Sequence, residues 1–252
     1  MKAYDKKDEE RSYFILNTSR RTQKNKGVRN IKAHITIVMH LYYVDMLERW
    51  TKYIDDIPPY IECLVISSNE ELIRIIESDV HYSNIKIVKK PNVGRDISAL
   101  LVAAKGYIKE SDYVCFVHDK KEHQDPYRYE ETDLWVHNLW ENTIGSSVYI
   151  ENVLETFEND PQLGILSVPE PIGLYFDTWA GRGWYGSFQA TKDLAEKLHL
   201  KCDISPDEPP VTIGTALWFR TMALSKLFSY PWDYTDFDDS KLKSGNYVSY
   251  AV

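Results

Sequence analysis

The sequence has few cysteines, and their spacing does not match a metal site or a redox pair. Its 252 residues include three cysteines, Cys63, Cys115 and Cys202, and contain no C-x-x-C motif. We therefore expect neither a zinc site nor a thiol redox motif. Cys63 and Cys115 lie within apolar runs, which predicts that both are buried free thiols.

Long apolar segments and several enzyme motifs are also missing. No run of 18 apolar residues occurs, which argues against a transmembrane helix, and the N-terminus lacks the apolar stretch of a signal peptide. These absences predict a cytoplasmic protein. The sequence also lacks G-x-G-x-x-G after its first predicted strand, G-x-S-x-G and the P-loop lysine motif. A classical dinucleotide fold, a serine hydrolase and a P-loop kinase are therefore disfavoured.

Charge is distributed unevenly along the chain. The formal net charge is −8, yet residues 1–32 contain ten Lys or Arg and four Asp or Glu. The stretch 20–32 contains six Lys or Arg and no acid. Such an arm can lie on anionic lipid or nucleic acid, and a solvated extension explains it equally well. Because the rest of the chain is acidic, we expect no broad nucleic-acid-binding face.

Strand and helix patterns alternate in the first half of the chain. Apolar, β-branched runs predict strands over 31–43, 61–67, 85–88 and 113–117. Helical spacing of apolar residues fills the intervals, with Ser68 or Asn69 capping one helix and Asp96 or Ser98 capping the next. Strands separated by helices indicate an α/β fold of Rossmann type with a mainly parallel central sheet.

The second half is less regular. Its patterns predict helices over 134–144, 148–157 and 192–198, and strands over 163–168 and 216–219. We expect three parts along the chain: a basic N-terminal extension (1–30), one α/β domain (31–232) and an acidic or polar C-terminal tail (233–252).

The first polar cluster is the turn 91–96 (PNVGRD), which follows the third predicted strand. Gly94 permits a left-handed or closely approached backbone, and Arg95 can bind a phosphate with two hydrogen bonds. Asp96 can cap the next helix or bind a ribose or a base. A plain turn before a capped helix is the alternative interpretation.

The second polar cluster is 118–121 (HDKK), directly after the fourth predicted strand. Titratable groups at the end of a buried strand are costly unless that end opens to a cleft. Lys120 and Lys121 can neutralise a diphosphate, and Asp119 can bind a divalent metal ion. His118 and His123 are a weak zinc signal because no further Cys or His accompanies them.

The third cluster is 214–220 (GTALWFR), where the small pair Gly214 and Thr215 precedes an aromatic strand. Small residues let a ligand approach the backbone closely, and Trp218 can serve as a platform for a sugar ring. An ordinary core strand is the alternative. The chain contains 18 Tyr, 8 Phe and 7 Trp, a supply that suits sugar-binding surfaces and cores alike.

In this order, these clusters resemble the rhamnan synthesis protein F family of bacterial polysaccharide-assembly proteins, whose members look like glycosyltransferases with a GT-A type fold. The resemblance spans about residues 33–230. The matching pieces are HLYY (40–43), PNVGRD (91–96), YVCFVHDKKEH (113–123), Trp135 with GSS (145–147), DPQLGILSVPEP (160–171) and GTALWFR (214–220).

The resemblance implies a GT-A-like enzyme that transfers a sugar, plausibly rhamnose or another deoxyhexose, from a nucleotide-sugar donor to a lipid-linked glycan. GT-A enzymes usually place Asp-x-Asp where this chain has His118, Asp119 and Lys120, so only one carboxylate is present for Mg²⁺ or Mn²⁺. The basic stretch 20–32 would hold the enzyme on the anionic inner membrane face. A non-catalytic relative that binds glycan or partner enzymes is the alternative.

The resemblance also assigns expected roles to individual residues. Asp119 is the expected metal ligand and an expected catalytic group. Asp236 and Asp238 are further expected catalytic groups, and a solvated tail is the alternative interpretation of their acidic segment. The expected donor-binding residues are Asn92, Gly94, Arg95, Asp96, His118, Lys120, Lys121, Gly214 and Thr215. The expected acceptor contacts are Trp179, Trp184, Tyr185 and Trp218.

Overall fold

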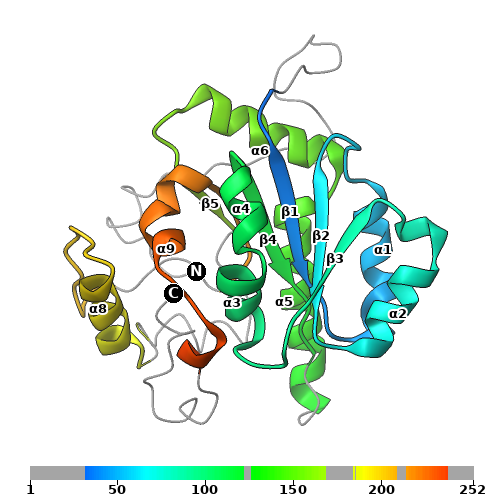
Figure 1. Cartoon of the computed structure of the whole chain (residues 1–252), viewed down its shortest axis with the longest axis horizontal. Helices are drawn as coiled ribbons and strands as arrows, with labels where there is room; N and C mark the ends of the chain where they lie inside the picture. The colour runs from blue at the N-terminus through cyan, green and yellow to red at the C-terminus, as the bar shows by residue number, and fades with distance from the viewer. Residues whose placement is uncertain (1–31, 122–125, 169–183, 185, 209–213, 238–252) are drawn as a thin grey trace, which may run out of the picture.

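A computed structural model describes residues 32–121, 126–168, 184, 186–208 and 214–237. A six-stranded sheet forms the middle layer, with helices on both of its faces (Figure 1). The strands are β1 (Ile35–His40), β2 (Glu62–Ser67), β3 (Ile85–Lys89), β4 (Tyr113–His118), β5 (Ile165–Ser167) and β6 (Leu217–Arg220). Each predicted strand run overlaps one of them, which confirms the α/β class.

The sheet is mostly parallel, as predicted. Its strand order is β3-β2-β1-β4-β6-β5. β1 to β4 run parallel to one another, whereas β6 pairs antiparallel with β4 and β5 pairs antiparallel with β6. The chain moves outward from β1 to β3 and then returns to the other side of β1 for β4. Open α/β sheets bind ligands at the carboxyl ends of the strands at such a reversal, here between β1 and β4.

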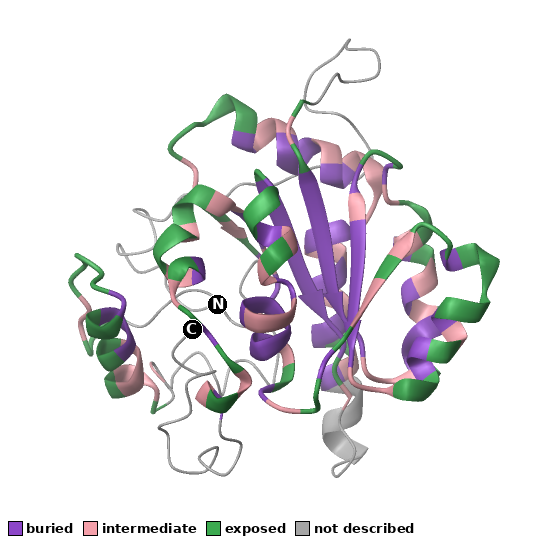
Figure 2. Ribbon diagram, in the orientation of Figure 1, coloured by how far each residue is buried: buried purple, intermediate pink, exposed green. Residues whose placement is uncertain are grey.

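Two hydrophobic clusters fill the spaces on either side of the sheet. Alternate residues of β1 belong to different clusters: Ile37 and Met39 to the first, Val38 to the second. Figure 2 shows the central strands almost entirely buried between the helices. The helices are α1 (Leu47–Asp55), α2 (Glu70–Ser78), α5 (Pro126–Ile144) and α6 (Ser147–Asn159) against the first cluster, and α3 (Arg95–Ser98), η4 (Ala99–Ala103), α4 (Lys105–Glu110), α8 (Phe188–Lys197) and α9 (Ser225–Ser229) against the second.

The predicted helix caps gave one correct and one wrong result. Asn69 caps α2, because its side chain accepts hydrogen bonds from the backbone N–H groups of Glu71 and Leu72. Asp96 and Ser98 do not cap the following helix. That helix begins at Arg95 after a left-handed Gly94, so both predicted caps lie inside its first turn.

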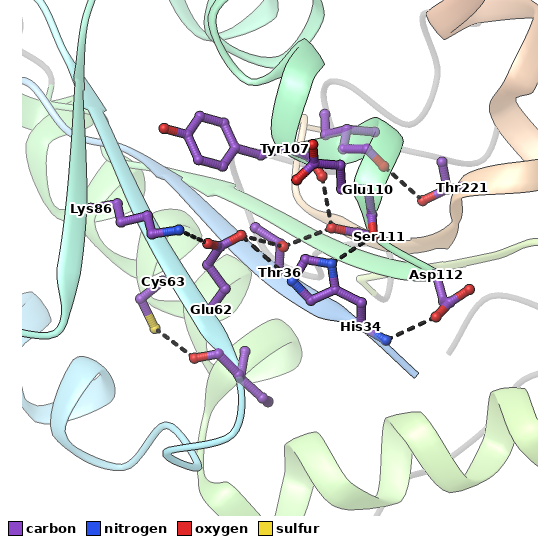
Figure 3. Close-up of polar contacts among 12 residues, drawn as sticks. His34, Thr36, Glu62, Cys63, Lys86, Tyr107, Glu110, Ser111, Asp112 and Thr221 are labelled. Atoms are coloured by element: carbon purple, nitrogen blue, oxygen red, sulfur yellow. Dashed lines mark hydrogen bonds and ion pairs between the residues drawn. The ribbon is translucent and has the colours of Figure 1, made fainter. Parts of the chain in front are cut away.

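The amino ends of the parallel strands are joined by a polar cluster, the amino-edge cluster, which consists of His34, Thr36, Glu62, Lys86 and Ser111 (Figure 3). Glu62 accepts a hydrogen bond from Thr36 at 3.2 Å and forms an ion pair with Lys86. The Thr36 and Ser111 hydroxyls lie 2.7 Å apart. These contacts link β1, β2, β3 and the turn before β4 at the edge opposite the polar clusters 91–96 and 118–121.

The structure tests the predictions about the cysteines and about a membrane-spanning helix. Cys63 and Cys115 are buried free thiols, as predicted, and Cys202 is exposed. Among the described residues, no helix is both long and apolar enough to cross a membrane. The predicted extension (1–30) and residues 238–252 of the predicted tail lie outside the described residues.

Candidate functional site

The turn 91–96 connects β3 to α3 through an unusual backbone. Gly94 has φ 68° and Arg95 has φ 50°. A left-handed φ is uncommon for arginine, and such residues often occur at functional sites. The buried Lys90 stabilises the turn, because its Nζ donates to the carbonyl oxygen of Val93 at 3.1 Å. Asn92 and Arg95 are exposed, so the polar groups predicted to bind a donor face solvent.

The cluster 118–121 follows β4 and is bonded to the loop after β1. Asp119 is 6 % exposed, and its Oδ2 accepts hydrogen bonds from the backbone N–H groups of Tyr42 at 2.8 Å and Tyr43 at 2.9 Å. Lys121 forms an ion pair with Asp45 in the same loop. Burial raises the pKa of Asp119 to about 7, although the Tyr43 and Tyr42 hydrogen bonds act in the opposite direction. Asp119 therefore holds two loops together.

The structure brings the three polar clusters together around Asp96. Its Oδ2 lies 3.8 Å from Nε2 of His118, and the side chain of Thr215 is near enough to favour its charged form. Burial opposes the charged form of Asp96, but His118, His40 and the hydrogen bonds outweigh it and lower its pKa. The Nδ1 of His118 donates to the carbonyl oxygen of Asp119 at 2.9 Å, since a carbonyl can only accept.

A second contact joins the clusters 118–121 and 214–220. The ammonium group of Lys120 lies 4.3 Å from the centre of the Trp135 ring, a cation–π arrangement. A Cβ on Gly214 would lie 2.8 Å from Cζ2 of the same ring. Gly214 also has φ 79°, so both the space and the backbone require glycine there. Trp135 on α5 therefore positions Lys120 next to the segment that carries Thr215.

Asp119 is the one carboxylate that the cluster 118–121 offers to the predicted metal ion. No group of three or more His, Cys, Asp or Glu side chains among the described residues is placed to hold a metal ion. Asp119 uses its Oδ2 for two backbone N–H groups, so it does not fit the role of a freely accessible ligand. The Mg²⁺ or Mn²⁺ ion therefore stays a prediction, and no chemical step is assigned to it below.

Two of the four predicted acceptor contacts, Trp184 and Trp218, lie within the described residues. Trp218 is 1 % exposed and donates its indole N–H to the carbonyl oxygen of Thr143 at 2.8 Å. The prediction that its ring contacts an acceptor is therefore wrong, because the core covers both of its faces. Trp184 is partly exposed and donates to the carbonyl oxygen of Ser205 at 2.9 Å. Trp179 and Tyr185 lie outside the described residues.

The C-terminal segment returns to the turn 91–96. Phe237 is buried in the second cluster, and a Cβ on Gly94 would lie 2.6 Å from its Cβ. The preceding Asp236 accepts a hydrogen bond from the backbone N–H of Asp233 and lies 3.8 Å from the ammonium of Lys197. Asp236 is thus close in sequence to a residue that touches the turn, whereas Asp238 lies outside the described part.

Two buried residues of this region were missed by the sequence reasoning. His40 ends β1 and is paired in register with His118 of β4. Lys90 follows β3 and is buried below the turn. Both lie at the carboxyl ends of apolar strands, which is the same signal that singled out His118 and Asp119. Applying that signal to every strand end would have found them.

Comparison with known proteins agrees with this assembly of motifs. A family model described as rhamnan synthesis protein F matches residues 2–252. The chain belongs to the rhamnan synthesis protein F family. Membership of the rhamnan synthesis protein F family ties the chain to the synthesis of rhamnan or a related polysaccharide. No curated protein matches the sequence.

Proposed function

We propose that the chain is a glycosyltransferase of cell-surface polysaccharide synthesis that uses a nucleotide-sugar donor. The contact of Asp96 with both His118 and Thr215 supports this proposal most directly, because it unites three clusters that are far apart in sequence. They meet at the carboxyl edge of the sheet, where α/β folds bind nucleotides. Family membership adds that the product belongs to polysaccharide synthesis.

The fold supports a GT-A-like assignment within this proposal. Three parallel strands precede the reversal, the parallel strand β4 follows it on the other side of β1, and an antiparallel β6 adds the segment with Gly214 and Thr215. The donor nucleotide would occupy the edge between β1 and β4. The turn 91–96 would lie on one side of it and Lys120 on the other.

The main catalytic contribution would be stabilisation of the departing nucleoside diphosphate. Charge develops on the diphosphate as the glycosidic bond to the donor breaks, and fixed positive groups lower the energy of that state. Lys120 is exposed and held over Trp135, and Arg95 is exposed at the turn. Both cations can face the diphosphate, and Lys121 forms an ion pair with Asp45.

Fewer contacts of the described residues support the proposed acceptor and the general base. An inverting transfer needs a general base to take the proton of the acceptor hydroxyl. Asp236 is the described candidate, since the segment that contains it packs on Gly94 through Phe237. The proposed acceptor is a lipid-linked glycan, and the proposed sugar is a deoxyhexose such as rhamnose. The basic stretch 20–32 would hold the enzyme on anionic lipid of the inner membrane face.

A transfer assay tests the proposal. UDP-, GDP- and TDP-activated sugars, including a rhamnose donor, are offered with membrane lipid extract as acceptor, with and without Mn²⁺. We expect release of one nucleoside diphosphate, and a loss of about tenfold to a hundredfold in kcat for Lys120→Met. Lys192→Met, an exposed change on α8, should keep the wild-type rate. Absence of turnover with every donor would refute the enzymatic assignment.

A non-catalytic binding relative is the second candidate. It is favoured by Asp119, the one carboxylate of 118–121, which is buried and bonded to two backbone N–H groups. This candidate predicts that a nucleotide or glycan binds without turnover in the same assay. The two functions are therefore separated by measuring binding and product release on the same preparation.

A further inference from the structure

His40 has a buried polar atom without a hydrogen-bond partner in the described part of the chain. The residue is 8 % exposed, and its Nε2 has no hydrogen-bond partner among the residues that the structure describes. Leaving a buried polar atom unsatisfied costs about 1–3 kcal/mol. Such atoms in native structures call for a specific explanation, and a ligand that completes the hydrogen bond is one.

The position of His40 points to a ligand at the reversal in strand order. His40 ends β1 and pairs in register with His118, the last residue of β4. The Nε2 of His118 lies 3.8 Å from Oδ2 of Asp96, which also contacts Thr215. The unpartnered atom therefore belongs to the strand ends that surround the Asp96 carboxylate.

The charges around His40 define the kind of group that it can bind. Burial lowers the pKa of His40 to about 3; Asp96 acts in the opposite direction, while Lys90 and His118 lower it further. At neutral pH the imidazole is thus uncharged, with one nitrogen donating and the other accepting. The nearby Asp96 is a carboxylate, which accepts hydrogen bonds and repels phosphate.

A hydroxyl group matches this environment better than a diphosphate does. It can donate one hydrogen bond and accept another, whereas phosphate oxygens carry negative charge and mainly accept. We propose that His40 is a specificity-determining residue whose Nε2, together with Asp96, binds a hydroxyl group of the sugar nucleotide. This inference rests on the proposed function. The hydroxyl can come from the ribose or from the sugar that is transferred.

Paired ligands with and without single hydroxyls test the inference by calorimetry. The nucleoside diphosphate that binds best among UDP, GDP and ribothymidine diphosphate is compared with its 2′-deoxy and 3′-deoxy forms and with its sugar conjugate. His40→Phe keeps a ring and removes both nitrogens. It should weaken binding of the hydroxyl-bearing ligand by about fivefold to fiftyfold and leave the ligand without that hydroxyl unchanged.

The pair that loses its selectivity identifies the source of the hydroxyl. If the ribose supplies it, the preference for the ribose over a deoxyribose form disappears in His40→Phe. If the transferred sugar supplies it, the difference between the sugar conjugate and the free diphosphate disappears instead. His40→Leu, which is smaller and also lacks the nitrogens, should give the same pattern.

Trp50→Phe is the matched control. Trp50 also has a buried ring N–H without a partner among the described residues, but it stacks on Trp140 at 4.2 Å in the first core cluster. Its variant should bind every ligand as the wild type does. An equal loss for all ligands in the His40 variants, or no change, would overturn the role of His40 alone. A wild-type protein that binds no nucleotide would overturn the proposed function as well.

Discussion

At the scale of single residues, Gly94 has no room for a side chain. A Cβ there would lie 2.6 Å from Cβ of Phe237 and 2.7 Å from Cβ of Ser98, and φ is +68°. We predict that Gly94→Ala lowers the free energy of unfolding by about 1–3 kcal/mol, because both the contact and the backbone are strained. Urea denaturation measures this change.

Gly106 provides the control for Gly94. It lies within α4, and a Cβ there would meet nothing within 4 Å. Gly106→Ala should leave stability unchanged or raise it by up to about 1 kcal/mol, because alanine has the higher helix propensity. Equal effects of the two substitutions would contradict the close packing of Phe237 on the turn.

The buried carboxyl group of Asp119 should make the stability of the protein depend on pH. Burial raises its pKa in the folded protein to about 7, whereas an unfolded aspartate has a pKa of about 3.9. Between these values the folded state keeps a proton that the unfolded state loses, so stability falls as the pH rises through this window. Asp119→Asn should lack this fall.

Denaturation of both proteins at about pH 5 and about pH 8 isolates the effect, since other titrating groups are shared. From about pH 5 to about pH 8, the free energy of unfolding should fall by a few kcal/mol more in the wild type than in Asp119→Asn. Each pKa unit corresponds to about 1.4 kcal/mol. The same pH dependence in both proteins would show that Asp119 is not the buried acid described.

At the scale of elements, the Glu62 carboxylate of the amino-edge cluster links the three neighbouring strands β1, β2 and β3. Glu62 contacts Thr36 on β1 and Lys86 on β3 (Figure 3). We predict that Glu62→Ala lowers the free energy of unfolding by about 1–3 kcal/mol, because the Thr36 hydroxyl loses a partner where it is fully buried. Nucleotide binding should not change, since this cluster lies at the edge opposite the candidate site.

Glu70 is the matched control for Glu62. It lies 3.7 Å from the ammonium of Lys89, and its side chain is 71 % exposed. An exposed pair of this kind contributes little, so Glu70→Ala should change stability by less than about 0.5 kcal/mol. If thermal or urea denaturation finds the two glutamate variants equally stable, the amino-edge cluster does not hold the strands together.

Element prediction succeeded where local signals were sufficient. Asn69 is followed by Glu70 and Glu71, and local hydrogen bonds of its side chain suffice to cap α2. The start of α3 depends instead on left-handed φ angles at Gly94 and Arg95 and on Phe237, which is distant in sequence. The pattern around Asp96 could not show that contact, so the helix start was misplaced.

At the scale of the whole molecule, the mainly parallel sheet followed from the alternation of strands and helices. The antiparallel pairing of β6 with β4 was not predicted, because it requires long-range register. The same limitation explains Trp218, which lies in a short strand that is covered on both sides. The candidate site was predicted as three separate clusters, and the sheet topology supplies their contact through Asp96.

Direct calorimetric binding of UDP, GDP and TDP to the wild type and to Thr215→Val tests the central claim that these clusters form one nucleotide site. Valine keeps the shape of threonine but removes the hydroxyl that favours the charged form of Asp96. We predict that the wild type binds at least one of the three nucleotides, and that Thr215→Val and Lys120→Met each weaken this binding by about tenfold. Absence of binding to all three nucleotides, or unchanged affinity in both variants, would contradict the single-site assignment.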